Sequence, residues 1–220
     1  MPNRIATETL ASAYIKAKLK VLASGFGSEI IWQRTVRIEE LTEVDLLRES
    51  AWVIISSGMR ESIVRQKFPG IGEAFFNWAS AQQIVWHRDH CVRSALIYFG
   101  NERKIEAIAQ SAQIIYDKGF EAIRKEIACD PITALRQFPY IGPTTSFHLA
   151  KNIGLSVAKP DRHLLRFAAL SGYEQPADLC RLIAEYIGDP VAVVDIVLWR
   201  FATLHQDYLT TFLQAGREDV

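Results

Sequence analysis

Apolar positions recur every three to four residues along most of this 220-residue chain, which is the spacing of one face of an α-helix. The alternation typical of a strand is almost absent, and no internal repeat or low-complexity segment occurs. The pattern predicts an all-α fold, in which segment 28–37 fits either a helix or a short extended piece. The predicted helices cover about 7–25, 42–59, 61–68, 71–79, 88–99, 101–118, 120–128, 131–135, 143–153, 161–170, 176–187 and 190–204.

Capping signals mark several of these helix ends. Thr42 stands three residues before Asp45, which is the spacing of a variant capping box. Asp130 precedes Pro131, and proline is well suited to the first position of a helix. Gly154 follows the helix predicted over 143–153 and is expected to be its C-terminal cap.

The order of the helices predicts a two-lobed helical bundle with a cleft between the lobes. The N-terminal 40 residues are expected to pack on the C-terminal helices, so that 1–40 and 155–220 form one lobe containing both termini. Residues 41–154 are expected to form a central lobe, which ends at about 135–153 in two short helices joined by a hairpin.

The composition is that of a globular protein without bulk charge. Hydrophobic residues make up 49% of the chain and charged residues 23%, and the formal net charge is zero. This excludes a polycation that binds nucleic acid by its overall charge, although it permits a local basic face. No apolar run reaches the roughly 18 residues that a membrane span needs, so we expect no membrane partner.

The cysteines give no sign of a cofactor. Cys91, Cys129 and Cys180 lie far apart and form no C-x-x-C pair, which argues against a zinc or iron–sulfur site built from cysteine. The five histidines show no metal-ligand spacing either. An odd number of cysteines and an N-terminus without an apolar signal region predict a cytoplasmic protein, associated with the nucleoid if the source is prokaryotic.

Charge is placed unevenly near the C-terminal end. Residues 131–170 carry five basic side chains and one acidic side chain, a net charge of +4. Residues 171–220 carry three basic and eight acidic side chains, a net charge of −5. The basic block favours a contact with phosphate, and chance clustering on a solvated face is the alternative.

Residues 138–145 indicate a tight hairpin that opens a helix. Gly142 permits the backbone conformations that a hairpin needs, and Pro143 suits the first turn of the following helix. The N–H groups around 141–146 are expected to face a phosphate, with the hydroxyls of Thr144 and Thr145 as further donors. An ordinary αα-hairpin without a ligand is the alternative.

An acid follows the hairpin. Asp161 stands sixteen residues after Thr145, at the start of the helix predicted over 161–170. This position makes it a candidate N-cap. A carboxylate near a helix N-terminus and beside Arg162 is expected to stay ionised, so the same side chain can cap the helix and act on a ligand.

Together these segments resemble the helix-hairpin-helix DNA glycosylases that carry a Gly/Pro-rich loop and a catalytic aspartate (HhH-GPD). The match is close over 131–170 and looser over 42–170. The resemblance implies that Asp161 is catalytic, since cleavage of a base–sugar bond builds positive charge that a carboxylate stabilises. It also implies a set of residues that contact DNA phosphates: Tyr140, Ile141, Gly142, Thr144, Thr145, Lys151, Arg162 and His163.

The resemblance further implies the partners. The protein is expected to be a monomer that binds double-stranded DNA containing a damaged or modified base. The hairpin carbonyls are expected to hold a sodium or potassium ion in the DNA complex, without side-chain metal ligands. Alkylated purines, oxidised guanine, mismatched pyrimidines and modified bases of foreign DNA all remain open as targets.

The sequence departs from the family pattern at three points. Thr144 occupies the position of the lysine that attacks the sugar in some members, which implies a monofunctional enzyme. Lys151 and Lys159 are the nearby substitutes, so a bifunctional glycosylase and lyase is an alternative. Tyr140 replaces a usual hairpin glycine, which weakens the phosphate clasp. The cysteine cluster of some relatives is absent.

A base-flipping enzyme also needs pocket walls and a side chain that fills the stack. Residues 56–60 lie where the family's intercalating segment falls, with Ser57 in it and with Met59 or Arg60 as the plug. Five aromatic residues are candidate walls, although core packing is the alternative for each. The walls that we consider are Trp52, Phe75, Trp78, Trp86 and Trp199, of which Trp52 and Trp199 are retained as site residues.

Asp195 stands four residues before Trp199 on the last strong helix. It is expected to be a structural anchor between the lobes, or else a second acid. The leading hypothesis is a monofunctional DNA N-glycosylase of base excision repair that uses Asp161. The alternatives are a non-catalytic helix-hairpin-helix DNA-binding protein and a small all-α interaction protein.

Overall fold

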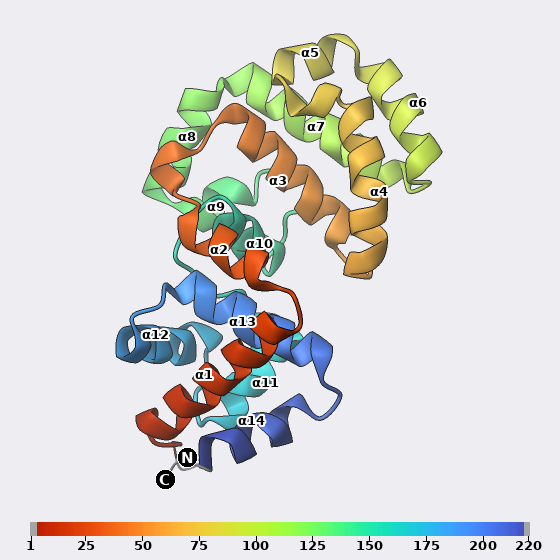
Figure 1. The fold of residues 1–220 in the computed structure, drawn as a ribbon. Helices are drawn as coiled ribbons and strands as arrows, with labels where there is room; N and C mark the ends of the chain where they lie inside the picture. Colours follow the sequence, from red (N-terminus) through yellow and green to blue (C-terminus); the bar gives the residue numbers. More distant parts are fainter. Residues whose placement is uncertain (1–3, 218–220) are drawn as a thin grey trace. The chain divides into compact units, whose positions relative to one another are not determined.

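The computed structural model describes residues 4–217, most of which are helical (Figure 1). The described residues form fourteen α-helices and two short 3₁₀ helices, without any strand. The predicted all-α class is therefore confirmed. The chain divides into two compact units: unit 1 comprises residues 1–37 and 154–220, and unit 2 comprises residues 38–153.

Unit 1 is built around a central apolar helix. Helix α13 (Val191–Leu204) packs against α1 (Thr7–Ala23), and α1 also packs against α14 (Tyr208–Arg217). The core is aromatic and aliphatic, with Phe167 and Phe201 almost completely buried. The other helices of unit 1 are α2 (Gly27–Thr35), α11 (Arg162–Leu170) and α12 (Pro176–Ile187).

One buried polar cluster ties unit 1 together. The hydroxyl of Tyr14 donates to Asp189 Oδ2 over 2.6 Å, and Lys18 donates to the same oxygen. Arg34 pairs with the other oxygen. Burial of the Tyr14 phenol raises its pKa, and its bond to Asp189 adds to this effect. The cluster satisfies a carboxylate that is 7% exposed, as a buried charge requires.

Unit 2 is organised around α7 (Glu102–Lys118), which packs against α3 (Glu43–Ser56), α5 (Ala81–Trp86) and α6 (Arg88–Tyr98). Apolar residues on α7 recur at helical spacing and are buried, which makes this helix the centre of the core. The remaining elements of unit 2 are η1 (Ile38–Glu40), α4 (Glu61–Ala74), η2 (Phe76–Trp78), α8 (Phe120–Cys129), α9 (Pro131–Leu135) and α10 (Thr145–Asn152).

Three helices differ from the sequence prediction. The helices predicted over 61–68 and 71–79 are replaced by one helix, α4, which runs through Pro69 and ends at Ala74, and by the short η2 after it. Helices α5 and α14 were not predicted. Segment 28–37, for which a helix and an extended piece were both open, is helical as α2. Tertiary packing of short apolar stretches explains these differences, because helix stability in proteins comes largely from burial of one face.

A left-handed turn follows α4. Phe76, Asn77 and Trp78 have φ of 53°, 49° and 67°, a conformation that costs about 1–2 kcal/mol per non-glycine residue. Trp78 is 5% exposed and stacks on Phe75 at 5.5 Å between ring centroids. Burial of these rings offsets the backbone strain.

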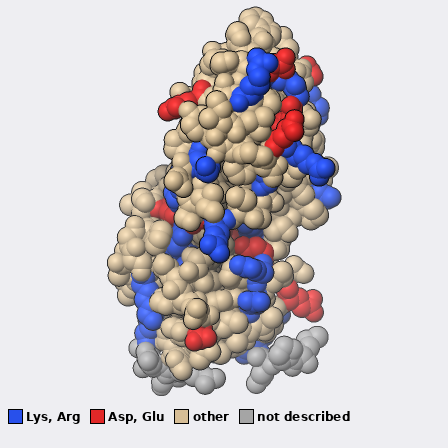
Figure 2. Space-filling model, turned by 90° about the vertical axis from the view of Figure 1, so that its right-hand side faces the viewer, with Lys and Arg blue, Asp and Glu red and all other residues tan. Residues whose placement is uncertain are grey.

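Charged side chains of both signs lie on the face of the molecule that Figure 2 draws. Lysine and arginine side chains are scattered over the face that Figure 2 draws, and aspartate and glutamate side chains lie among them. This dispersion agrees with the formal net charge of zero. Any contact with a polyanion therefore depends on particular local groups.

Candidate functional site

Asp161 is the N-cap of α11. Its Oδ1 atom accepts hydrogen bonds from the backbone N–H groups of His163 at 2.9 Å and Leu164 at 3.1 Å, which confirms the predicted cap. The side chain keeps 13% of its accessible surface. Its Oδ2 atom takes neither capping bond and faces Lys159 Nζ at 3.8 Å. One oxygen thus holds the helix, and the other lies beside a cation.

The loop before Asp161 is fixed from α13. Asp195 Oδ2 accepts from the backbone N–H of Lys159 at 2.7 Å, and the N–H of Asp161 donates to the carbonyl of Lys159 at 2.8 Å. Asp195 is 1% exposed, so the alternative prediction that it is a second acid in contact with substrate is wrong. Its bond to Lys159 lies within unit 1 and orders the backbone two residues before the candidate catalytic carboxylate.

His163 is held in place on α11. Its ring packs edge-on against Tyr208, with 5.4 Å between ring centroids, and its Nε2 accepts from Arg162 Nε at 3.2 Å. Burial lowers the pKa of the imidazole, partly countered by Asp161 and reinforced by Arg162, Arg166 and Lys159. An Nε2 that accepts a hydrogen bond belongs to the neutral ring with its proton on Nδ1.

The predicted hairpin connects α9 and α10, which pack against each other in unit 2. The positive φ of this turn lies at Tyr140, at 63°, whereas Gly142 does not adopt one. The expectation that Gly142 supplies the special backbone conformation is therefore wrong. An added Cβ at Gly142 would meet Thr145 Oγ1 at 3.9 Å, which is ordinary contact. The strained position of the turn carries an aromatic side chain that is 45% exposed.

The hairpin uses several of its own donors. Gly142 N–H donates to Thr145 Oγ1 at 2.7 Å, and Thr145 Oγ1 donates to the carbonyl of Tyr140 at 3.2 Å. Ile141 N–H bonds Phe138, and Ser146 N–H bonds Gly142. The Thr145 hydroxyl closes the turn, so it does not extend toward a ligand as expected. Helix α10 begins at Thr145, two residues later than Pro143 suggested.

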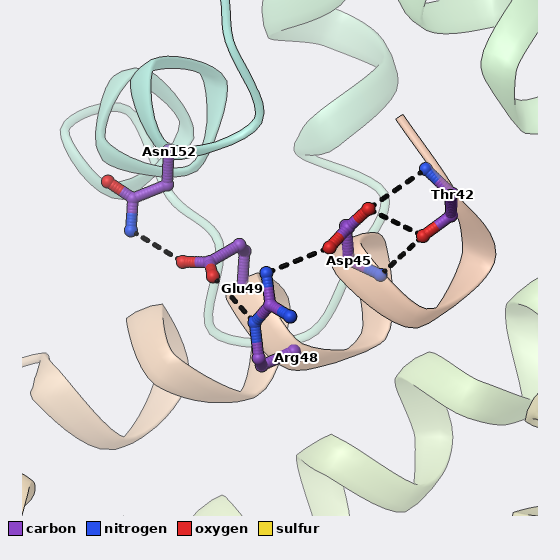
Figure 3. Close-up of polar contacts among 5 residues, drawn as sticks. All are labelled: Thr42, Asp45, Arg48, Glu49 and Asn152. Atoms are coloured by element: carbon purple, nitrogen blue, oxygen red, sulfur yellow. Dashed lines mark hydrogen bonds and ion pairs between the residues drawn. The ribbon is translucent and has the colours of Figure 1, made fainter. Parts of the chain in front are cut away.

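Helices α3 and α10 are joined by a buried carboxylate (Figure 3). Asn152 Nδ2 donates to Glu49 Oε2 at 2.9 Å, and Arg48 Nε donates to Glu49 Oε1 at 3.0 Å. At the start of α3, Thr42 and Asp45 form the predicted capping box, which is confirmed. Helix α3 is thus fixed at its first turn and, one turn further on, to the second helix of the hairpin.

The segment expected to enter the base stack follows α3 directly. Gly58 has φ of 70°, and Met59 is 37% exposed, with Arg60 also exposed. Lys104 Nζ donates to the carbonyl of Ile55 at 2.8 Å and to the carbonyl of Ser57. The side chains proposed as a plug therefore reach the surface from a turn that a buried lysine holds.

The candidate aromatic walls separate into buried and half-exposed rings. Phe75 and Trp78 are buried, which assigns them to the core, and Trp86 is 67% exposed. Trp52 is half-buried on α3, edge-on to Phe68 at 5.1 Å and within 5.8 Å of the Arg65 guanidinium. Trp199 is half-buried in unit 1, where the Arg200 guanidinium lies 4.8 Å from its ring.

The predicted phosphate contacts differ in exposure. Arg162 is exposed and Thr144 is half-buried, whereas Ile141 and Lys151 are only 4% exposed. A hollow of about 390 Å³ lies beside the hairpin, between Tyr140 and the face of α7 that carries Glu102, Arg103, Glu106 and Gln110. Tyr140 therefore borders a polar concavity that carries charges of both signs.

Groups that could hold a metal are sparse. Within residues 4–217, no three histidine, cysteine or acidic side chains gather closely enough to bind a metal ion. The three cysteines are free thiols, and burial raises the pKa of Cys91 to about 11. None of the described helices combines the length and apolar character needed to cross a bilayer.

The residues singled out from the sequence thus fall into two groups. Asp161, Arg162, His163 and Trp199 belong to unit 1, whereas the hairpin, Trp52 and segment 57–60 belong to unit 2. Sequence reasoning missed Lys104, whose only signal was a lysine within an otherwise apolar helical stripe. Comparisons with models of protein families, with curated proteins and with solved structures find no match.

Proposed function

We propose that this chain is a DNA N-glycosylase of the helix-hairpin-helix class, in which Asp161 assists cleavage of the bond between a damaged or modified base and its sugar. The observation that carries the proposal is that the two oxygen atoms of this carboxylate have different environments. Oδ1 caps α11, while Oδ2 remains outside the cap at a partly exposed position.

The proposed reaction is a hydrolysis. The C1′–N bond breaks with its electron pair leaving on the base, and positive charge develops on the deoxyribose. A carboxylate such as Asp161 stabilises that charge and orients a water molecule. The water oxygen then bonds to C1′, and its released proton balances the charge on the departing base.

The hairpin supports the DNA-binding half of the proposal. Helices α9 and α10 pack against each other on either side of its turn. Thr144 and Thr145 lie at the N-terminus of α10, where backbone N–H groups favour a bound phosphate. Exposed Met59 and Arg60 supply the side chains that occupy the vacated stack. Because the net charge is zero, binding is expected to depend on these local contacts and to weaken with salt.

A panel of duplexes, each with one lesion, tests the activity. Protein is incubated with each duplex, and alkali then converts abasic sites into strand breaks. Asp161→Asn keeps a good helix cap but removes the charge, so it should lower the rate of base release about a hundredfold or more, with duplex affinity within about threefold. Asp178→Asn, in the first turn of α12, is the matched control and should cleave as wild type does.

Three results would redirect the proposal. Salt-sensitive duplex binding without abasic product on any lesion would favour the non-catalytic DNA-binding protein. No duplex binding at low salt would favour the interaction protein. An Asp161→Asn variant that cleaves at the wild-type rate would remove Asp161 from the reaction.

The position of Lys159 favours one second candidate. Its ammonium lies 3.8 Å from Asp161 Oδ2, so a lysine stands beside the proposed acid although Thr144 replaces the usual nucleophile. In a bifunctional enzyme this amine would displace the base at C1′ and form an imine that borohydride reduces to a stable crosslink. Crosslinking by wild type that disappears in Lys159→Met would establish this activity, and no crosslink would exclude it.

A further inference from the structure

A buried lysine of α7 closes the C-terminal end of α3. The Nζ atom of Lys104 donates to the carbonyl of Ile55 at 2.8 Å and to the carbonyl of Ser57, and the residue is only 5% exposed. Ser57 immediately precedes the exposed Gly58, Met59 and Arg60, and Ile55 lies two residues before Ser57 in the last turn of α3. The contact joins α7 to the turn across 47 to 49 positions in the sequence.

The helix ends at this turn because its hydrogen bonding changes. The N–H of Met59 bonds the carbonyl of Ser56, not that of Ile55, as a continued α-helix would require. Gly58 takes a φ of 70°, which turns the chain away. Lys104 takes over the carbonyl of Ile55, which the helix has released, so a buried acceptor remains satisfied.

Burying the Lys104 ammonium costs free energy, and holding the turn is the gain that we consider against this cost. Burial lowers the pKa of the Lys104 ammonium, and lysine is among the residues most rarely buried. Lys104 also lies in the first turn of its own helix, where a cation is disfavoured. Its ammonium meets the C-terminal end of α3 instead, where the helix dipole and the carbonyls attract a positive charge.

We propose that Lys104 is a positioning residue for base flipping: its ammonium fixes the turn at 57–60 so that Met59 and Arg60 enter the DNA stack already ordered. The proposal rests on the proposed glycosylase function. An ordered plug fills the vacated space without losing conformational freedom as it enters. The benefit is greatest where the target base is paired and the stack resists opening.

The test compares Lys104→Met, which keeps the aliphatic stem and removes the donors, with wild type. Single-turnover base release is measured on a fully paired target and on the same target in an unpaired bubble. We expect the variant to be about tenfold slower on the paired duplex and less than about threefold slower on the bubble. Lys118→Met, at the exposed C-terminal end of the same helix, is the matched control and should match wild type on both.

A second measurement does not depend on catalysis. A protease specific for arginine is expected to cleave after Arg60 several-fold faster in Lys104→Met than in wild type or in Lys118→Met, because the turn is released. If Lys104→Met fails to fold, Gly58→Ala replaces it. The added Cβ meets nothing within 4 Å but is strained at φ of 70°, so it should disturb the turn and give the same dependence on pairing.

Equal losses on paired and unpaired targets would reduce Lys104 to a purely structural role, and unchanged proteolysis after Arg60 would show that it does not hold the turn. Either result overturns the proposal. If wild type releases no base from any duplex, the proposed function fails and the role in base flipping fails with it. The proteolysis then decides separately whether Lys104 orders residues 57–60.

Discussion

Asn152 donates its side-chain amide to Glu49 Oε2 over 2.9 Å, and this bond links the last turn of α10 to α3 (Figure 3). Glu49 is 8% exposed and also receives Arg48 at 3.0 Å. The second helix of the hairpin and the helix that precedes the exposed turn at 57–60 are thereby fixed within one unit. The proposed phosphate contact and the proposed plug therefore adjoin two helices that Glu49 and Asn152 join.

Glu49 should make stability depend on pH. Burial raises the pKa of this carboxyl above its ordinary value of 4.5, although Arg48 and Asn152 partly oppose the shift. The native state then holds the proton more tightly than the unfolded state, so this stabilising contribution is complete below pH 4.5 and is lost as pH rises through the native pKa. Glu49→Gln stays neutral and should remove that slope when unfolding by urea is followed from pH 4 to pH 7.

The control for Glu49 is Glu121→Gln, a change of the same charge at a side chain that is 65% exposed on α8. Its unfolding should follow the wild-type dependence on pH. A Glu49→Gln variant whose unfolding free energy runs parallel to that of wild type over this range would show that the native carboxyl is not shifted upward.

His163 should make stability depend on pH in the opposite sense to Glu49. Its pKa is lowered below 6.5 chiefly by burial, so the unfolded state binds the proton more tightly. The contribution to the unfolding free energy is complete above pH 6.5 and is lost as pH falls through the native pKa. His163→Phe keeps a ring against Tyr208 without titrating. Its advantage over wild type should grow as pH falls from 7 to 5, and imidazole NMR titration of wild type would show a midpoint below 6.5.

The hairpin gives a prediction about backbone conformation. At Tyr140, where φ is 63°, asparagine should be tolerated better than valine, because a β-branched residue resists the left-handed region. Both substitutions remove the ring, so a difference of about 1–2 kcal/mol in unfolding free energy isolates the strain. Equal stability of Tyr140→Asn and Tyr140→Val would contradict the assigned conformation.

Gly142→Ala completes this comparison. Gly142 lies outside the positive-φ region, and the added methyl group makes only ordinary contact with Thr145. The substitution should leave stability unchanged or raise it by up to about 1 kcal/mol, since alanine restricts the unfolded chain. Thermal unfolding measures the effect, and a loss of more than about 1 kcal/mol would indicate that glycine is required here after all.

Features set by neighbouring residues could be predicted from the sequence. The capping box of Thr42 and Asp45, the start of α9 at Asp130 and Pro131, and the cap formed by Asp161 each depend on residues two or three positions apart. These signals locate helix ends reliably, because the bonds they make are local. They also place the candidate acid at the start of α11.

Features that depend on distant partners could not be predicted. The bond between Asp195 and Lys159 spans 36 positions, and the contact of Lys104 with Ile55 spans 49. Neither leaves a periodic pattern in the sequence. The left-handed turn at Phe76–Trp78 likewise depends on rings of Phe68 and Phe75 that cover it, and residue preferences alone disfavour it.

The division of the chain into an uninterrupted unit 2 and a split unit 1 has a consequence for biosynthesis. A ribosome completes residues 38–153 before it makes α13 and α14, the helices against which α1 packs. Unit 2 can therefore fold as it emerges, whereas α1 keeps its apolar face exposed until α13 and α14 have been translated.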